Sequence, residues 1–353
     1  MKNNYALIMA GGVGSRFWPI STPEKPKQFI DILGIGKSLL QLTVERITSM
    51  VPSSNIFILT NEDYKGIVLE QLPILKSENV ICEPQRKNTA PCIAFASAKI
   101  HSKNANAKLV ILPSDHLIIN ESSFLKTIQN GLQECENNSI VTIGINPTRP
   151  ETGYGYIEIS EEDRVDQNLA FEVIQFREKP NLEIAKQFLE SGNFLWNAGI
   201  FIWKSEIIIE SFKKYSPDLF DLFFKNLAVY NSTEEAEFAV QVFSKCEDIS
   251  IDYAILEKAP NVRVICADFD WSDLGTWNSL SQHLNKDNQG NHVNSEKISH
   301  FECNNNVFIL PKDKTAIIDG LNGYLVIDQN NKLLILKIAN DQKIKEYLKS
   351  TEK

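Results

Sequence analysis

Short apolar runs alternate with longer amphipathic stretches over the first 145 residues of the chain. The apolar runs span 5–9, 56–60, 108–112 and 140–144, and the amphipathic stretches span 38–50, 89–103 and 122–134. A repeated strand–helix–strand order predicts a parallel sheet with helices on both faces. We therefore expect an α/β fold with a Rossmann-like, mostly parallel mixed sheet. Its ligands should collect beyond the carboxyl ends of the strands.

The pattern changes twice further along. From residue 150, strand-like runs at 153–157 and 198–203 mix with helical stretches at 182–190 and 205–215. After Gly290 the chain is β-rich, with short runs at 306–310, 315–319, 323–328 and 332–338 before a charged helix from Asp341. The polar stretch 285–292 is typical of a linker. We expect a main domain over 1–285, with parts 1–150 and 151–285, and a small β-rich domain over 291–353 that ends in a helix.

The amino-acid composition limits the classes of molecule that the chain is expected to bind. The chain is 43% hydrophobic and 23% charged, with a formal net charge of -9. This balance argues against a nucleic-acid surface, which is basic over a broad face, but a few cations in a cleft still suffice for a nucleotide. After Lys2 the apolar run is too short for a signal sequence, and no later run approaches a membrane span. We expect a cytoplasmic protein with no membrane partner.

Three closely spaced glycines, Gly11, Gly12 and Gly14, follow the first apolar run. Consecutive N–H groups exposed in such a turn form an anion site, because no Cβ atom blocks the ligand. Arg16 and Lys27 add two cations near the same strand end. This combination suits a triphosphate better than a neutral sugar or a lipid.

Two better-known glycine motifs do not fit this region. The dinucleotide fingerprint requires G-x-G-x-x-G, and here Arg16 and Phe17 occupy the place that the last glycine would approach. A phosphate-binding P-loop is imitated at 36–38, but the glycine it requires five residues earlier is Asp31. We instead predict that Ser38 begins a helix with a capping box completed by Gln41.

Two acids end or interrupt apolar segments. Asp115 follows the run 108–112, and Asp273 lies between two tryptophans in the segment 270–277. Either carboxylate is a suitable ligand for Mg²⁺, which takes few protein oxygens and completes its shell with water and phosphate. The alternative is that each aspartate caps a turn. The spacing alone does not bring the two acids together.

Further along the sequence, a carboxylate, a lysine and an amide are candidates for a second binding site. Glu178 and Lys179 precede a helix, and Asn197 opens an apolar strand. A lysine for phosphate, with a carboxylate and an amide for hydroxyls, suits a sugar phosphate. A solvated ion pair and a turn cap are the structural alternatives. The segment 83–91, which contains Asn88 and Thr89, offers groups of the type that read a base edge.

Taken in order, these motifs resemble those of bacterial mannose-1-phosphate guanylyltransferases, also called GDP-mannose pyrophosphorylases. The matching segments are 11–19 with 26–29, 83–91, 112–116, 153–157, 176–180, 196–199, 250–254 and 271–277. The specific part is Trp18-Pro19 with 26–29, since all sugar nucleotidyltransferases share the glycine turn. The resemblance implies the sugar nucleotidyltransferase fold, with a short left-handed β-helical C-terminal appendage. Long members carry a further cupin-type isomerase domain, for which this chain has no room, so transferase activity alone is expected.

The resemblance implies transfer of GMP from GTP to α-D-mannose 1-phosphate, which gives GDP-mannose for polysaccharide biosynthesis, and pyrophosphate. The resemblance also implies that the nucleotide is held by Gly11, Gly12 and Gly14. The triphosphate would be neutralised by Arg16 and Lys27. The resemblance further implies that Mg²⁺, or alternatively Mn²⁺, is shared by Asp115 and Asp273. Mannose 1-phosphate would be held by Gly155, Glu178, Lys179 and Asn197. Guanine would lie beside Asn88 and Thr89. Arg16, Lys27, Asp115, Lys179 and Asp273 form the implied catalytic set.

Two other functions stay open at this point. In the first, the chain is a nucleotidyltransferase for another base or for another sugar phosphate, such as that of a heptose or glucose. In the second, it is a non-catalytic regulator that binds GDP-mannose. The presence of all five implied catalytic residues favours an enzyme. The β-rich region either makes a homodimer through its edges or its apolar face, or packs on its own catalytic domain.

Overall fold

The computed structural model describes residues 2–12, 14–160 and 170–351, and its contacts divide the chain into two compact units. Unit 1 comprises Met1–Gly11, Thr43–Ser114 and Ile118–Trp271, and unit 2 comprises Gly12–Leu42, Asp115–Leu117 and Ser272–Lys353. Residues 12–42 therefore group with the C-terminal part of the chain, although they follow the first strand directly. The expected division into a main domain over 1–285 and a β-rich domain over 291–353 stays a prediction.

Unit 1 contains a mixed sheet that has nine strands within the described ranges, in the order β3-β2-β1-β4-β9-β6-β10-β8-β7. The strands are β1 Asn4–Met9, β2 Ile56–Asn61, β3 Val80–Glu83, β4 Lys108–Pro113, β6 Ile140–Ile145, β7 Tyr156–Ile159, β8 Phe171–Arg177, β9 Phe194–Lys204 and β10 Val262–Ala267. Strands β1 to β4 pair in parallel, as does β6 with β10. Strand β9 is antiparallel to β4 and β6, and β8 to β10 and β7. The sheet is mixed, as expected: β3-β2-β1-β4 and the pair β6–β10 are parallel, whereas the pairings of β9 and β8 are antiparallel, so the sheet is less parallel than we expected.

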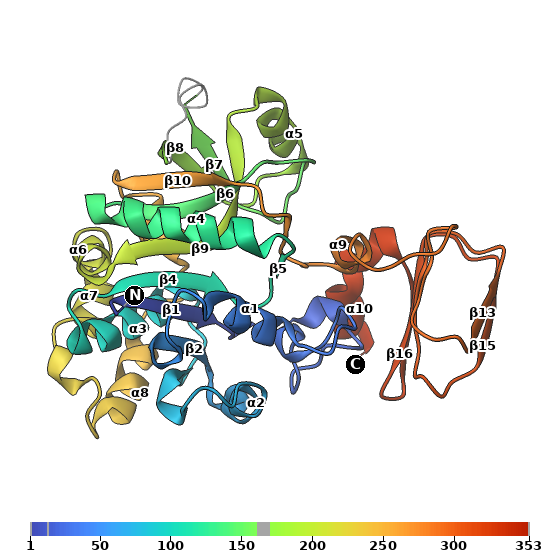
Figure 1. The fold of residues 1–353 in the computed structure, drawn as a ribbon, viewed down its shortest axis with the longest axis horizontal. Helices are drawn as coiled ribbons and strands as arrows, with labels where there is room; N and C mark the ends of the chain where they lie inside the picture. Colours follow the sequence, from blue (N-terminus) through green and yellow to red (C-terminus); the bar gives the residue numbers. More distant parts are fainter. Residues whose placement is uncertain (1, 13, 161–169, 352–353) are drawn as a thin grey trace. The chain divides into compact units, whose positions relative to one another are not determined.

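Helices cover this sheet, as Figure 1 shows for α4, which contacts β9 and β10. The helices are α1 Leu39–Ile47, which begins in unit 2, α2 Lys65–Gln71, α3 Thr89–Lys103, α4 Glu121–Glu134, α5 Leu182–Ser191, α6 Ser205–Tyr215, α7 Pro217–Phe223 and α8 Glu235–Lys245. Helix α3 packs against α6 and α7, and its largely apolar sequence is buried nearly throughout. Two short strands, β5 Leu117–Ile118 and β11 Trp271–Ser272, stand where the chain passes between units.

Local signals explain where several helices begin and end. Ser38 and Gln41 form the expected capping box, with the Ser38 N–H bonded to Gln41 Oε1 at 2.9 Å and the Gln41 N–H to Ser38 Oγ at 3.3 Å. Gly192 ends α5 in the left-handed conformation, at φ +77°. The helices expected at 89–103 and 205–215 have those bounds.

Unit 2 begins with two short 3₁₀ turns, η1 Ser15–Phe17 and η2 Lys27–Phe29, and continues after unit 1 with helix α9 Trp277–Ser281. Its apolar core joins these distant segments. Phe17, Trp277 and Ile344 are each at most 1% exposed and belong to one buried cluster. The rings of Phe17 and Trp277 pack with centroids 5.3 Å apart.

Short strands form the remainder of unit 2. They are β12 His292–Val293, β13 Ile298–Phe301, β14 Val307–Ile309, β15 Ala316–Asp319, β16 Tyr324–Gln329 and β17 Lys332–Lys337. Strands β12, β14 and β16 pair in parallel, β13 pairs with β15 in parallel, and β16 and β17 form an antiparallel pair. The 3₁₀ turn η10 Ile338–Lys343 then leads into helix α10 Ile344–Thr351. In the described ranges, none of the helices is both long and apolar enough to cross a bilayer.

Candidate active site

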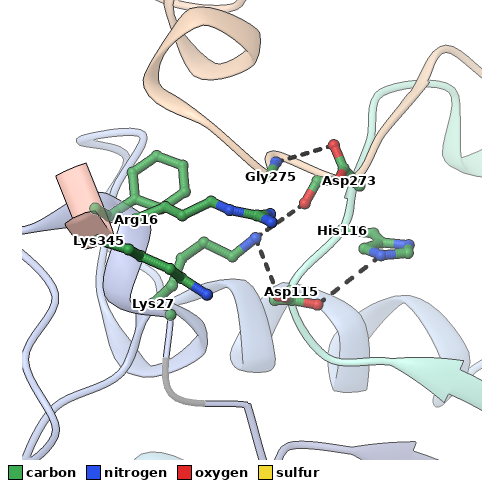
Figure 2. A pocket seen from close by; sticks show the side chains of 9 residues that line it. Arg16, Lys27, Asp115, His116, Asp273, Gly275 and Lys345 are labelled. Carbon is green, nitrogen blue, oxygen red and sulfur yellow. Dashed lines mark hydrogen bonds and ion pairs between the residues drawn. The ribbon is translucent and has the colours of Figure 1, made fainter. Parts of the chain in front are cut away.

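A cavity of about 270 Å³ in unit 2 gathers side chains from four separate stretches of sequence. Its lining consists of Gly14, Arg16, Phe17, Lys27, Asp115, His116, Asp273, Gly275 and Lys345. Figure 2 shows the cations and the acids facing this space. Four of the five residues in the implied catalytic set therefore lie in one place.

The glycine turn is packed against the turn that carries Lys27. Gly14 has φ +59°, and a Cβ at this position would lie 2.8 Å from the backbone nitrogen of Lys27. Both the conformation and the space therefore require glycine. The carbonyl of Gly12 accepts a hydrogen bond from Gln28 Nε2 at 2.8 Å. Gly12 helps to fix the turn, and Gly14 lines the cavity.

Lys27 is a buried cation that three protein acceptors hold. Its Nζ lies 3.0 Å from Asp115 Oδ2, 2.9 Å from the carbonyl of Asp273 and 2.8 Å from that of Leu274. An ammonium group has three donors, so these contacts match its full capacity. Lys27 therefore joins three of the four stretches that line the cavity, in addition to contributing its charge.

The two acids line the cavity in different environments. Burial by itself would raise the pKa of Asp115, but the charges of Lys27 and His116 outweigh it, so the pKa lies below its usual value. Asp115 is therefore ionised at neutral pH. Asp273 accepts a hydrogen bond from the Gly275 N–H at 2.9 Å through Oδ1. His116 lines the same cavity, with its Nε2 3.9 Å from Asp115 Oδ1.

The donor set fits a divalent cation of the magnesium type. No group of three or more histidine, cysteine and acidic side chains able to cage a metal occurs within residues 2–12, 14–160 and 170–351. Mg²⁺ does not require such a cage, since one or two carboxylates with water and phosphate complete its shell. Asp115 and Asp273 on one cavity meet this requirement, although their spacing in the sequence gave no sign of it.

Arg16 and Lys345 differ from Lys27 because neither has an acidic partner. Both side chains are exposed at the cavity, and neither forms an ion pair with any residue that the structure describes. Lys345 comes from α10, and our sequence reasoning did not assign it any role. No motif surrounds it, so only the packing of α10 in unit 2 reveals its position.

Unit 1 holds a second polar cluster, in which Asn197 occupies the central position. Its Nδ2 donates to Asp252 Oδ1 at 3.0 Å, and its backbone N–H donates to the carbonyl of Gly155 at 2.8 Å. A Cβ on Gly155 would lie 2.7 Å from Glu178 Oε2, so the glycine leaves room for that carboxylate. Three of the four expected sugar-phosphate residues thus meet here.

Lys179 and Asp252 complete this cluster. The Nζ of Lys179 donates to Glu178 Oε1, while the lysine side chain stays 61% exposed. Burial and, second, the charge of Glu178 raise the pKa of Asp252 to about 6. Asp252 lies in the segment 250–254 of the family resemblance, where it had no assigned role; its environment depends on Glu178, which is distant in sequence.

The residues expected beside guanine are tied to the same segment. The Thr89 hydroxyl accepts a hydrogen bond from the Ile251 N–H at 2.8 Å, and Asn88 Oδ1 accepts from the Thr89 N–H at 2.9 Å. Glu83, at the end of β3, faces Gly11, since a Cβ there would lie 3.8 Å from its Oε1. Burial raises the pKa of Glu83 to about 7, against the lowering effects of Cys92 and Arg86. Glu83 opens the segment 83–91 that we singled out in the sequence, but we assigned it no role of its own.

Fold and site together define a nucleotidyltransferase, and the comparisons agree. A family model described as nucleotidyl transferase matches residues 5–290. The chain is similar to a mannose-1-phosphate guanylyltransferase of Salmonella montevideo, 38% identical over 98% of this chain and 73% of that protein. It is also similar to a mannose-1-phosphate guanylyltransferase of Escherichia coli strain K12, 36% identical over the same shares. A crystal structure from Thermus thermophilus, described as a mannose-1-phosphate geranyltransferase, covers 99% of this chain and 100% of its own at 27% identity and a TM-score of 0.88. The chain therefore belongs to the nucleotidyl transferase family, and within it to the mannose-1-phosphate guanylyltransferases.

Proposed function

We propose that this chain transfers GMP from GTP to α-D-mannose 1-phosphate and releases pyrophosphate. The observation that carries the proposal is the unit 2 cavity, in which Arg16, Lys27 and two aspartates gather in a member of this family. A neutral sugar or a lipid would not require this density of charge, whereas a triphosphate does.

The reaction forms a bond between a sugar-phosphate oxygen and the α-phosphorus of GTP, as the bond from that phosphorus to the bridging oxygen of pyrophosphate breaks. The attacking oxygen is already anionic at neutral pH, so the chain need not supply a general base. Catalysis then rests on positioning and on neutralising charge. Arg16 binds the triphosphate and the departing pyrophosphate. Lys27 adds positive charge and holds Asp115 and the segment 273–274 in place.

Asp115 and Asp273 would hold Mg²⁺, with Mn²⁺ as the alternative. A divalent cation bound there would supply positive charge to the α-phosphate region of the nucleotide. The lowered pKa of Asp115 keeps its carboxylate available as a ligand at neutral pH. Gly11, Gly12 and Gly14 leave space for the nucleotide, with Asn88 and Thr89 beside guanine.

Unit 1 contributes the acceptor side of the reaction. Lys179 is exposed and binds the phosphate of mannose 1-phosphate, whereas Glu178 and Asn197 bind sugar hydroxyls. Gly155 keeps Glu178 free of a steric clash at this position. We add Asp252 to this set, because its contact with Asn197 Nδ2 fixes how that amide points.

We further propose that the β-rich strands of unit 2 form a short left-handed β-helix and that the chain is a cytoplasmic homodimer. The parallel pairing of β12, β14 and β16 and of β13 with β15 supports the first proposal. Exposed apolar side chains at Phe301, Ile317, Leu333 and Ile335 support a homodimer. Light scattering of the full chain should give a dimer mass that Ile317→Lys reduces. A monomer mass for the unaltered chain would favour packing within one chain.

Pyrophosphate release from each pair of four nucleoside triphosphates and three sugar 1-phosphates tests the activity. GTP with mannose 1-phosphate should react fastest by a wide margin. Another preferred pair would identify a nucleotidyltransferase for a different sugar or base. If no pair reacted while calorimetry detected GDP-mannose binding, the chain would be a regulator.

A further inference from the structure

Helix α10 brings one side chain, Lys345, to the cavity that Arg16 and Lys27 line. Figure 2 shows Lys345 beside Arg16, with its amino group directed to the same space as the Lys27 ammonium. The segment that carries Lys345 lies far along the sequence from the glycine turn and from both aspartates. Its position therefore comes from packing within unit 2.

The packing that holds Lys345 is specific. Ile344, the preceding residue, is 1% exposed and lies in the buried cluster of Phe17 and Trp277. Asp341, one turn earlier, is 4% exposed, and its Oδ2 accepts a hydrogen bond from the Asn278 N–H at 2.8 Å. A carboxylate that accepts from the first turn of α9 stabilises that helix end. The start of α10 is thus attached to the core by one apolar and one polar contact.

The charges around Lys345 are unfavourable as long as the cavity contains only protein. Partial burial lowers the pKa of Lys345, and the positive charges of Arg16 and Lys349 lower it further. Neither Arg16 nor Lys345 forms an ion pair with a residue in the described part of the chain. Of the two acids that line the cavity, Asp115 is paired with Lys27, and Asp273 accepts a hydrogen bond from the Gly275 N–H. Two adjacent cations without an acid are expected where the ligand itself supplies the negative charge.

We propose that Lys345 binds the terminal phosphates of the nucleoside triphosphate, together with Arg16, and stays bound to pyrophosphate as it leaves. The C-terminal helix is then part of the active site. This inference rests on the proposed function for its substrate and extends the set of phosphate-binding residues beyond the glycine turn. In Figure 2 the two aspartates lie across from Arg16 and Lys345, and Lys27 lies between, which leaves the Arg16 and Lys345 side for the phosphates farthest from the reacting phosphorus.

The test compares Lys345→Ala with Lys345→Arg and with the matched control Lys343→Ala. Lys343 is exposed two residues earlier, and it does not line the cavity. We expect Lys345→Ala to raise the KM for GTP and the inhibition constant of pyrophosphate by about 10-fold or more, as the loss of one charge-assisted hydrogen bond predicts. The KM for mannose 1-phosphate should not change. The arginine variant should recover most of the affinity, and Lys343→Ala should match the unaltered chain.

Two further measurements separate this inference from a structural role and from the proposed function. Without ligand, Lys345→Ala should not lower the Tm, since it removes a repelled charge, whereas a lysine needed for folding would lower it. Calorimetric titration with pyrophosphate should show the same weakening, and this measurement does not depend on turnover. Equal pyrophosphate affinity in the alanine variant and the unaltered chain would overturn the inference. Absence of turnover in the unaltered chain would overturn only the proposed function.

Discussion

In the unit 2 cavity, Arg16 and Lys345 have no acidic partner among the described residues, whereas in the unit 1 cluster Lys179 is paired with Glu178. The unit 1 cluster also includes Asp252 and the amide of Asn197, so hydrogen-bonding oxygens outnumber its cations. The cavity is therefore arranged for a ligand of high negative charge. The cluster is arranged for a ligand with many hydroxyls and one phosphate. Under the proposed function, the two substrates would therefore be bound by different physical means.

The largest expected effect concerns the cations of the cavity. Arg16→Ala and Lys27→Ala should each lower kcat by about 10²-fold or more, the effect of losing one preorganised charged donor. Lys27→Ala also leaves Asp115 without its partner, so circular dichroism should accompany the kinetics. Lys25→Ala, at an exposed position outside the cavity lining, is the matched control. Unchanged turnover in both variants would remove the charge-neutralisation mechanism.

A smaller effect is expected from the one cation of the cluster. Lys179→Ala should raise the KM for mannose 1-phosphate by about 10-fold and leave the KM for GTP unchanged. Steady-state kinetics with each substrate varied in turn measures both values. Lys186→Ala, exposed on α5, serves as the control. A variant in which only the KM for GTP rises would reverse our assignment of the two regions.

The smallest effect is one of stability and concerns Asp252. Its folded pKa is raised to about 6 by burial and by Glu178, so the folded chain binds this proton more tightly than the unfolded chain. The stabilisation from protonation is complete below the unfolded pKa and is lost as the pH rises through about 6. Asp252→Asn, which cannot ionise, should therefore gain about 1–2 kcal/mol in free energy of unfolding at neutral pH.

Denaturant unfolding at several pH values measures this difference, which should shrink toward zero near pH 4 because Asp252 is then protonated in the folded chain. Asp248→Asn, at an exposed position nearby, provides the comparison. A gain that stayed constant across the pH range would mean that ionisation of Asp252 is not its cause. A confirmed gain would show that the cluster keeps an acid there at the expense of stability.

Local signals in the sequence predicted elements in both units. The helix at 89–103 and the Ser38–Gln41 capping box depend on neighbouring residues, and both were correct. Strands β3 and β10 were missed, because each is a short run between polar residues. The sequence predicted a mixed sheet but not which strands pair antiparallel, because strand direction depends on long connections. The last helix begins at Ile344, after a 3₁₀ turn, and not at Asp341, whose carboxylate instead bonds to Asn278.

The candidate site also contains residues that the sequence predicted and residues that it did not. Motifs that are continuous in sequence gave Arg16, Lys27 and the two aspartates, and the structure brings these four to one cavity. Lys345 has no motif around it, and its position depends on Ile344 entering a core built from distant segments. The pKa of Asp252 depends on burial and on Glu178, which lies far away in the sequence. Residue types were therefore predictable, whereas partners and charge states required the fold.

The hydrogen bond between the Asn278 N–H and Asp341 also has a consequence for dynamics. A bonded amide exchanges its hydrogen with solvent only when the bond opens. The Asn278 amide therefore acts as a reporter for release of the C-terminal helix, on a residue that itself belongs to α9. If bound pyrophosphate holds Lys345, it also slows this opening, and the protection of a single amide records occupancy of the cavity by its ligand.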